Sequence, residues 1–266
     1  MTPVSKHRHS VVVAFGDVCI ETVVDGDGPA IVILPSLGRD GYEDYDAVSR
    51  RLVAAGWRVL RPQPRGIGSS SGPMDGVLLP ELARDVAEVI RAQGGGRAVI
   101  VGHAYGNWVA RMTAVAHPDA VRGIVVAAAA ARHPPSDIRT APGIAGNLDL
   151  PDGQRLDALR DAFFAPGNDA AAWLHGWYPR TQKMQAASSR GAVTPDVWWH
   201  AGSAPVLELI PDADPFKPRV SWRELADELG ERVHVEVIAG ASHALFPEQP
   251  QAVAAAIDAW ARALPA

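Results

Sequence analysis

The sequence has one cysteine, no long apolar run and no excess of positive charge. Cys19 alone excludes an internal disulfide framework and a cysteine-rich metal site. The apolar stretch 124–131 is far shorter than the roughly 20 residues that a membrane-spanning helix needs. Twenty-five Lys and Arg face 30 Asp and Glu, which gives a formal net charge of −5. We therefore expect neither nucleic acid nor a membrane as a partner.

Residues 1–10 are polar and basic, and no apolar run of the signal-peptide kind follows them. We therefore expect a cytoplasmic location. Apolar residues make up 47% of the 266 positions and the mean hydropathy is −0.01. These values suit one large α/β domain with a sizeable core and room for an inserted segment. We expect a small-molecule substrate as the partner, and the sequence leaves a homodimer open.

Apolar runs separated by turn residues predict strands that alternate with helices. The expected strands are 11–14, 18–24, 30–34, 57–61, 98–101, 121–131, 204–210 and 233–238. The expected helices are 45–55, 79–93, about 105–117, 221–229 and 249–264. Such alternation predicts an α/β fold with a mostly parallel twisted sheet and helices on both of its faces.

Between the strands 121–131 and 204–210 the alternation stops and the composition changes. Prolines and tryptophans accumulate there, and 156–164 and 169–177 have the pattern of short helices. We predict an inserted helical cap at 132–203 and a core domain made of 1–131 and 204–266.

One stretch has the frame of a catalytic turn. Gly102-His103-Ala104-Tyr105-Gly106 follows a buried strand and precedes a helix, with the glycine spacing of the G-x-S-x-G nucleophile elbow. Small residues are needed at such a turn because strand and helix pass close together. The central residue is Ala104, so the frame of a nucleophile site is present without a nucleophile.

Four further segments follow the appropriate strands. They are Pro35-Ser36-Leu37-Gly38, Gln63-Pro64-Arg65-Gly66-Ile67-Gly68-Ser69-Ser70, Pro211-Asp212-Ala213-Asp214-Pro215-Phe216-Lys217-Pro218 and Gly240-Ala241-Ser242-His243. In this order, together with the elbow, they resemble the α/β-hydrolase superfamily over nearly the whole chain. Two positions depart from the family pattern. Gln63 replaces an aspartate, and Pro35-Ser36 replaces the usual His-Gly of the oxyanion loop.

The resemblance assigns His243 as the general base and Asp214 as the acid that orients it. The alternative interpretations are a histidine without function and a turn aspartate before Pro215. Asp212 competes for the acid role. We favour Asp214 because of its spacing from the proline.

The resemblance also implies an oxyanion hole made by the backbone N–H groups of Leu37 and Tyr105. His103 is interpreted as a packing residue and Arg65 as an anchor of its own loop. Arg39 is a candidate contact for an anionic substrate group, with a solvated loop arginine as the alternative. Trp173, Trp177, Trp198 and Trp199 are the candidate substrate-binding residues of the cap, of which we expect one or two to touch substrate.

An alanine methyl cannot attack a carbonyl carbon, so Ala104 forms no acyl-enzyme. The resemblance implies hydrolysis of a small or medium hydrophobic ester or lactone without a metal or organic cofactor. Ala104 is then either an engineered replacement of a serine or the native residue. If it is native, His243 and Asp214 would support water activation, C–C cleavage, a lyase step or cofactor-free oxygenation. A ligand-binding pseudoenzyme is the third alternative.

Overall fold

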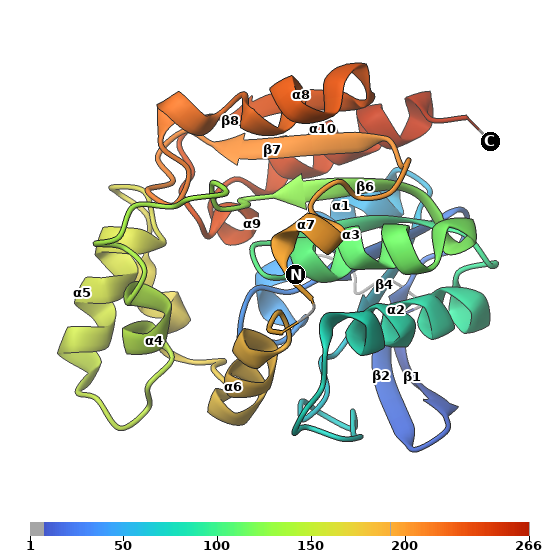
Figure 1. The fold of residues 1–266 in the computed structure, drawn as a ribbon, viewed down its shortest axis with the longest axis horizontal. Coiled ribbons are helices and arrows are strands. Elements are labelled where there is room, and N and C mark those ends of the chain that lie inside the picture. The colour runs from blue at the N-terminus through green and yellow to red at the C-terminus, as the bar shows by residue number, and fades with distance from the viewer. Residues whose placement is uncertain (1–7, 192, 266) are drawn as a thin grey trace.

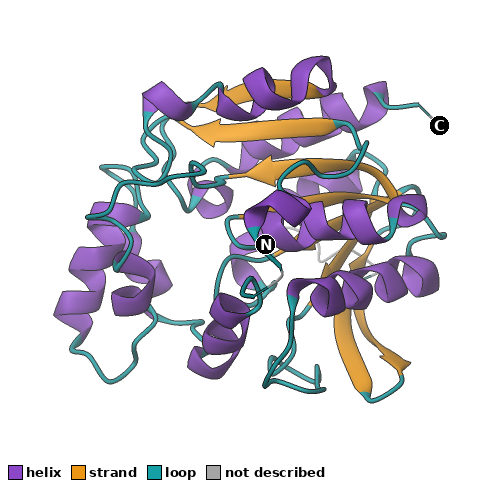
Figure 2. Ribbon diagram, viewed as in Figure 1, coloured by secondary structure: helices purple, strands orange, loops and turns teal. Residues whose placement is uncertain are grey.

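The computed structural model describes residues 8–191 and 193–265, and residues 1–7 of the amino-terminal stretch discussed above lie outside this part. It contains an eight-stranded sheet in the order β1-β2-β4-β3-β5-β6-β7-β8. The strands are β1 (His9–Phe15), β2 (Val18–Asp25), β3 (Ala30–Leu34), β4 (Arg58–Pro62), β5 (Ala98–His103), β6 (Val121–Ala127), β7 (Val206–Pro211) and β8 (Val233–Ile238). Figure 2 shows this sheet in orange between purple helices.

The sheet is mostly parallel, as the alternating pattern predicts. β1 pairs with β2 and β2 with β4 in antiparallel fashion, and all the other neighbours are parallel. β3 and β5 are buried along their whole length, which suits central strands covered on both faces. The carboxyl ends of β3, β5, β7 and β8 meet at one edge, where open α/β sheets bind ligands.

Helices cover both faces of the sheet (Figure 1). α2 (Leu79–Gln93) and α3 (Gly106–Ala116) pack on one face, and α1 (Asp46–Ala54) and α10 (Pro250–Ala263) pack on the other. The remaining α-helices outside the insertion are α8 (Glu224–Leu229) and α9 (Leu245–Glu248). Short 3₁₀ turns are η1 (Glu43–Tyr45), η2 (Pro118–Ala120), η4 (Arg219–Ser221) and η5 (Gly230–Arg232).

β6 ends at Ala127, four residues earlier than the alanine-rich run predicted. Ala128 has a φ of +47°, which a strand does not accommodate. Its N–H donates to the carbonyl of Leu209 at 3.1 Å, and the N–H of Ala131 donates to that of Phe216 at 2.9 Å. The prediction was wrong here because alanine composition does not distinguish a strand from the buried turn that follows it.

The segment between β6 and β7 forms short helices. They are α4 (Ala141–Ala145), α5 (Asp152–Ala162), η3 (Ala170–Leu174), α6 (Pro179–Ala187) and α7 (Pro195–Trp198). Of these, α4 and α5 lie beyond the carboxyl edge of the sheet while α7 lies against α3 (Figure 1). Phe163, Trp173 and Trp177 belong to a separate apolar cluster in this region. We keep the division into a core domain and a cap at 132–203 as a proposal.

Across the described ranges 8–191 and 193–265, no helix combines the length and the apolar character needed to cross a membrane.

Candidate active site

The elbow lies between β5 and α3. The N–H of Ala104 donates to the carbonyl of Ala127 at 2.8 Å, and Ala104 has a φ of +48°. A Cβ on Gly102 would lie 2.5 Å from the backbone of Asn107, and one on Gly106 would lie 2.5 Å from the carbonyl oxygen of Leu34. Both glycines are therefore required by close backbone approach, and the turn presents residue 104 at the sheet edge.

His243 and Asp214 come together at this edge. The imidazole Nδ1 lies 2.9 Å from Oδ2 of Asp214, and both residues are buried. Because the carboxylate accepts, Nδ1 carries the proton and Nε2 of the neutral ring holds the free lone pair. The competing Asp212 instead accepts the N–H of Gly240 at 2.9 Å. The geometry thus pairs the histidine with the acid favoured from the sequence.

The loop after β7 fixes the acid. Oδ1 of Asp214 accepts a hydrogen bond from the N–H of Phe216 at 2.9 Å. The backbone carbonyl of Asp214 accepts one from the N–H of Lys217 at 3.1 Å. The ammonium of Lys217 is buried and lies 2.7 Å from Glu208 on β7 and 3.1 Å from Glu224. Burial raises the pKa of Glu208, and the Lys217 ammonium opposes that rise. This ion pair anchors the loop to the strand that precedes it.

The histidine loop is held from the cap side. The N–H of Ala244 donates to the carbonyl of Phe163 at 2.8 Å. Glu248 accepts the N–H of Ser242 at 2.7 Å with one oxygen and the N–H of Ala165 at 2.6 Å with the other. The rings of Phe163 and Phe216 contact the His243 ring, with centroids 5.4 and 4.5 Å away. These contacts fix the imidazole relative to the insertion.

The two predicted oxyanion-hole donors line the same cavity as His243. In the described part of the chain, no hydrogen bond uses the N–H of Leu37 or that of Tyr105. The neighbours of Leu37 are fixed, because the N–H of Ser36 donates to the hydroxyl of Tyr45 at 3.1 Å and that of Gly38 to Gln185 at 2.7 Å. An oxyanion hole requires backbone N–H groups that have no other acceptor and that are held in fixed positions.

The cavity has a volume of about 240 Å³ and a largely apolar wall. Its lining residues are Ser36, Leu37, Ala104, Tyr105, Asn107, Trp108, Ala130, Pro142, Phe163, Trp177, Ala186, Phe216 and His243. A second cavity of about 50 Å³ lies behind Tyr105, next to the ion pair of Arg65 with Asp85. The larger cavity is the candidate substrate site because it contains the elbow, the histidine and both amides.

Among the predicted substrate-binding tryptophans, Trp177 lines this cavity. Trp173 is instead fully buried in the apolar cluster that it forms with Phe163 and other residues of the segment between β6 and β7. Trp198 stacks on Trp108 with centroids 5.0 Å apart, and the indole of Trp199 covers the Arg111 guanidinium at 4.3 Å. These last two pack α7 against α3, so of the four candidates Trp177 alone lines this cavity.

Arg39 was also predicted to contact substrate, and the structure uses it differently. Its guanidinium lies 2.8 Å from Asp44, donates to the carbonyl of His175 at 2.9 Å and stacks 4.2 Å from the ring of Trp173. The side chain is only 5% exposed. The alternative of a solvated loop arginine was wrong because the side chain is buried, and Arg39 does not line the larger cavity. Arg65, in contrast, holds its own loop as expected, through a bidentate pair with Asp85 and the carbonyl of Pro73 at 3.1 Å.

Several lining residues escaped the sequence analysis. Phe163, Phe216, Trp108, Pro142 and Ala186 come from five different segments and carry no reactive group. Phe216 stands two residues after Asp214, and that proximity was the one available signal. The described residues contain no group of three or more His, Cys, Asp or Glu side chains placed to hold a metal ion.

Comparisons with known proteins agree with this geometry. Residues 31–256 match the sequence model of the Alpha/beta hydrolase family. A pyrethroid hydrolase of Sphingobium wenxiniae is 28% identical over 249 residues, covering 82% of the chain and 83% of that protein. Epoxide hydrolase B of Mycobacterium tuberculosis is 34% identical over 103 residues. That match covers 38% of this chain and only 29% of the epoxide hydrolase.

Solved structures show the same fold. An esterase from Rhodococcus sp. ECU1013 has a TM-score of 0.75 at 25% identity, covering 97% of this chain and 99% of that one. An esterase from Thermogutta terrifontis also has a TM-score of 0.75, at 20% identity, with 96% and 98% covered. The family match extends from β3 into α10 and includes the elbow and the acid and histidine loops. The chain belongs to the α/β-hydrolase family.

Proposed function

We propose that this chain hydrolyses a small or medium hydrophobic ester or lactone, with His243 as general base and no metal or organic cofactor. The observation that carries the proposal is the 2.9 Å pair of His243 with Asp214 in the cavity that Ala104 lines. A histidine with a carboxylate on Nδ1 has the tautomer and support for proton transfer near neutral pH.

Water takes the place of a side-chain nucleophile in this proposal. Nε2 of His243 accepts a proton from a water molecule while the water oxygen bonds to the substrate carbonyl carbon. The carbonyl oxygen becomes an oxyanion that accepts from Leu37 and Tyr105. The C–O bond to the alcohol then breaks, and the imidazolium returns the proton to the departing oxygen. Asp214 stabilises the imidazolium throughout.

The proposal also accounts for the strained elbow. A residue other than glycine at positive φ costs on the order of 1 kcal/mol, and Ala104 keeps that conformation. The turn leaves the N–H of Tyr105 without a hydrogen-bond partner. It can therefore supply an oxyanion-hole donor even without a hydroxyl at position 104. If Ala104 replaces a serine of the natural protein, the same site is a serine hydrolase with His243 and Asp214 completing the triad.

Support for the substrate class comes from the cavity wall and from the relatives. The wall is mostly apolar, with Phe163, Trp177 and Phe216 as its large members. Both structural relatives described above are esterases by name, and the pyrethroid hydrolase matches over most of its length. A cavity of about 240 Å³ suits an acid or alcohol group of a few carbon atoms.

The missing hydroxyl favours a second candidate. His243 could abstract a proton directly from a substrate carbon in a C–C cleavage, a lyase step or a cofactor-free oxygenation, with the two amides stabilising an enolate. In this case ester turnover is absent, and the cavity still needs the His243–Asp214 pair.

The test is hydrolysis of p-nitrophenyl esters from acetate to octanoate by the chain and by His243→Ala. His234→Ala is the matched control, because His234 is exposed on β8. We expect turnover that falls at least 100-fold in His243→Ala and is unchanged in His234→Ala. Equal turnover in His243→Ala would overturn the proposal. Ester binding without any product would exclude hydrolysis and leave the proton-abstraction candidate and a binding protein.

A further inference from the structure

A buried chain of hydrogen bonds lies directly behind the candidate site. The hydroxyl of Tyr45 accepts the N–H of Ser36 at 3.1 Å and lies 2.8 Å from Nδ1 of His103. The other ring nitrogen, Nε2 of His103, lies 2.7 Å from the backbone carbonyl of His243. Tyr45 and His103 are both fully buried, and neither lines the substrate cavity.

The direction of each hydrogen bond follows from the chemistry of the groups. A carbonyl oxygen only accepts, so Nε2 of His103 carries the proton. Burial and the nearby His243 lower the pKa of His103 to about 3, which leaves the ring neutral. Nδ1 is then an acceptor, and the Tyr45 hydroxyl donates to it while accepting from Ser36. Every donor in the chain therefore has one acceptor.

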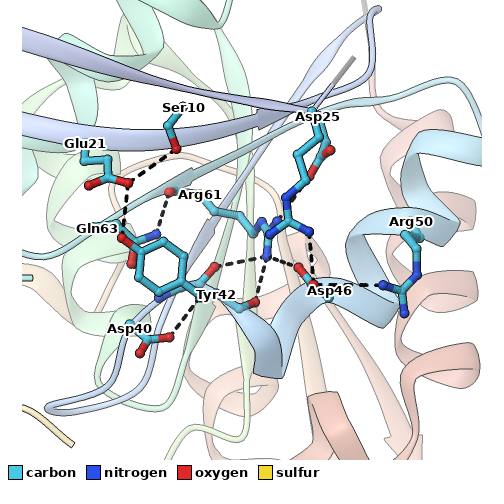
Figure 3. A network of polar contacts seen from close by, with 11 residues as sticks. Ser10, Glu21, Asp25, Asp40, Tyr42, Asp46, Arg50, Arg61 and Gln63 are labelled. Carbon is cyan, nitrogen blue, oxygen red and sulfur yellow. Dashed lines mark hydrogen bonds and ion pairs between the residues drawn. The ribbon is translucent and has the colours of Figure 1, made fainter. Parts of the chain in front are cut away.

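Arg61 of β4 holds the segment that contains Tyr45, and Figure 3 shows its contacts with Tyr42 and Asp46. The fully buried Arg61 donates to the carbonyls of Gly41 and Tyr42, at 3.1 and 2.7 Å, and to Asp46 at 2.7 Å. Its other terminal nitrogen lies 3.1 Å from Asp25. The residues on both sides of Tyr45 are thus tied to β4, through the carbonyls of Gly41 and Tyr42 and the side chain of Asp46.

The chain connects three segments that each supply one reacting group. Ser36 precedes Leu37, the first oxyanion-hole donor. His103 lies in the elbow, two residues before its donor, Tyr105. The carbonyl at the other end belongs to His243 itself. A displacement of about 1 Å in such a constellation can cost about 100-fold in rate.

We propose that Tyr45 and His103 are positioning residues that set the spacing between the two oxyanion-hole amides and the general base. This inference rests on the hydrolytic function proposed above. It assigns His103 a role beyond the packing role expected from sequence. Neither residue touches substrate, and both act through the backbone of the groups that do.

The first experiment measures ester hydrolysis by Tyr45→Phe, which keeps the ring and removes the hydroxyl. We expect kcat to fall about 10- to 100-fold while KM changes less than threefold, because the cavity wall is unchanged. Tyr42→Phe is the matched control. Tyr42 lies in the same segment as Tyr45, but its hydroxyl donates to Glu21 at 3.1 Å. An unchanged kcat in Tyr45→Phe would overturn the proposal, as would an equal loss in Tyr42→Phe.

A pair of His103 variants separates positioning from packing. His103→Gln can still donate to the His243 carbonyl, whereas His103→Leu fills the space without a donor. We expect His103→Gln to retain kcat within about fivefold and His103→Leu to lose as much as Tyr45→Phe. Equal activity of the two variants would show that volume alone matters and would contradict the proposal.

An NMR measurement is independent of turnover. In ¹⁵N-histidine spectra of the chain we expect a neutral His103 ring protonated at Nε2 from pH 5 to pH 8. In Tyr45→Phe we expect the Nδ1 resonance of His103 and the ring resonances of His243 to shift. A protonated Nδ1, or His243 signals insensitive to Tyr45→Phe, would overturn the connection. If no ester is turned over, the proposed hydrolytic function fails. These spectra still decide whether the hydrogen bonds through Tyr45 and His103 connect the oxyanion loop to the histidine loop.

Discussion

The backbone N–H of Ala104 donates a 2.8 Å hydrogen bond to the carbonyl of Ala127, and this contact joins the elbow to the end of β6. Ala104 sits at φ +48°, a conformation that costs a side-chain-bearing residue free energy. The chain therefore maintains a nucleophile turn in which the side chain is a methyl group. What the turn preserves is the position of the Tyr105 N–H and the opening toward His243.

Ala104→Ser restores a hydroxyl at the elbow. We expect the variant to hydrolyse p-nitrophenyl esters on the order of 100-fold faster than the parent chain, because an acyl-enzyme route opens. Stopped-flow absorbance should show a burst of p-nitrophenol that the parent chain lacks. A fluorophosphonate should label the variant, which mass spectrometry detects. Ser36 and Ser242 in the parent chain serve as internal controls, and labelling of the parent chain would contradict the assignment of residue 104.

Asp214→Asn removes the charge beside Nδ1 of His243. We expect kcat to fall about 10²- to 10⁴-fold, since the imidazole loses the partner that fixes its tautomer and stabilises its charged form. Asp212→Asn is the control, because Asp212 bonds the N–H of Gly240 and not the imidazole. Ester hydrolysis at pH 7.5 measures both, and a greater loss in Asp212→Asn would transfer the acid role to that residue.

His103 makes the stability of the fold depend on pH. Its pKa is lowered by burial to about 3 in the folded chain, against 6.5 ordinarily. Below pH 6.5 His103 is protonated in the unfolded chain but stays neutral in the folded chain until the pH approaches 3. The free energy of unfolding is therefore unaffected by His103 above pH 6.5 and decreases as the pH falls toward 3. At pH 5 the loss is about 2 kcal/mol.

Urea unfolding at pH 7.5 and pH 5.0 measures this effect. We expect the difference in unfolding free energy between the two pH values to be about 2 kcal/mol smaller in His103→Gln than in the parent chain. The comparison cancels the contribution of the other titrating groups. Equal differences in the two proteins would show that His103 is protonated in the folded state.

Gln185 connects the insertion to the oxyanion loop through the N–H of Gly38. Gln185→Leu removes the acceptor and leaves that buried N–H without a partner, so we expect kcat to fall about tenfold. Gln185→Glu keeps an acceptor and should lose less. Gln154→Leu, at an exposed position of α5, controls for the change of side chain. Steady-state ester hydrolysis distinguishes the three, and identical rates in all three would separate α6 from the oxyanion hole.

Sequence patterns identified the parts of the fold whose residues are buried by regular structure. Strands 30–34 and 233–238 and helix 79–93 match β3, β8 and α2 in both bounds. Continuous apolar runs and a 3.6-residue period carry this information. α6 (Pro179–Ala187) was missed because its polar sequence has no apolar stripe. Its helix is set by contacts with the oxyanion loop, which no local pattern records.

The same distinction applies to the site. Asp214 and His243 could be named because each follows its strand at a characteristic spacing. The contacts of Trp199 and Arg39 could not be, since both depend on how the insertion folds over the core. The link from Tyr45 to His103 spans 58 positions and joins two buried side chains from different elements. A single sequence carries no signal for such a pair.

β6 and β7 are hydrogen-bonded neighbours, with Ile124 opposite Val206 and Ala127 opposite Leu209. Because the two strands are parallel, the long segment between them leaves the sheet at the carboxyl end of β6 and re-enters it at the opposite edge, at the amino end of β7. A module transplanted between β6 and β7 would therefore have to span the length of a strand as well as cover the carboxyl edge of the sheet. A transplanted module would have to supply equivalents of two contacts, the Phe163 carbonyl for Ala244 and the Gln185 side chain for Gly38.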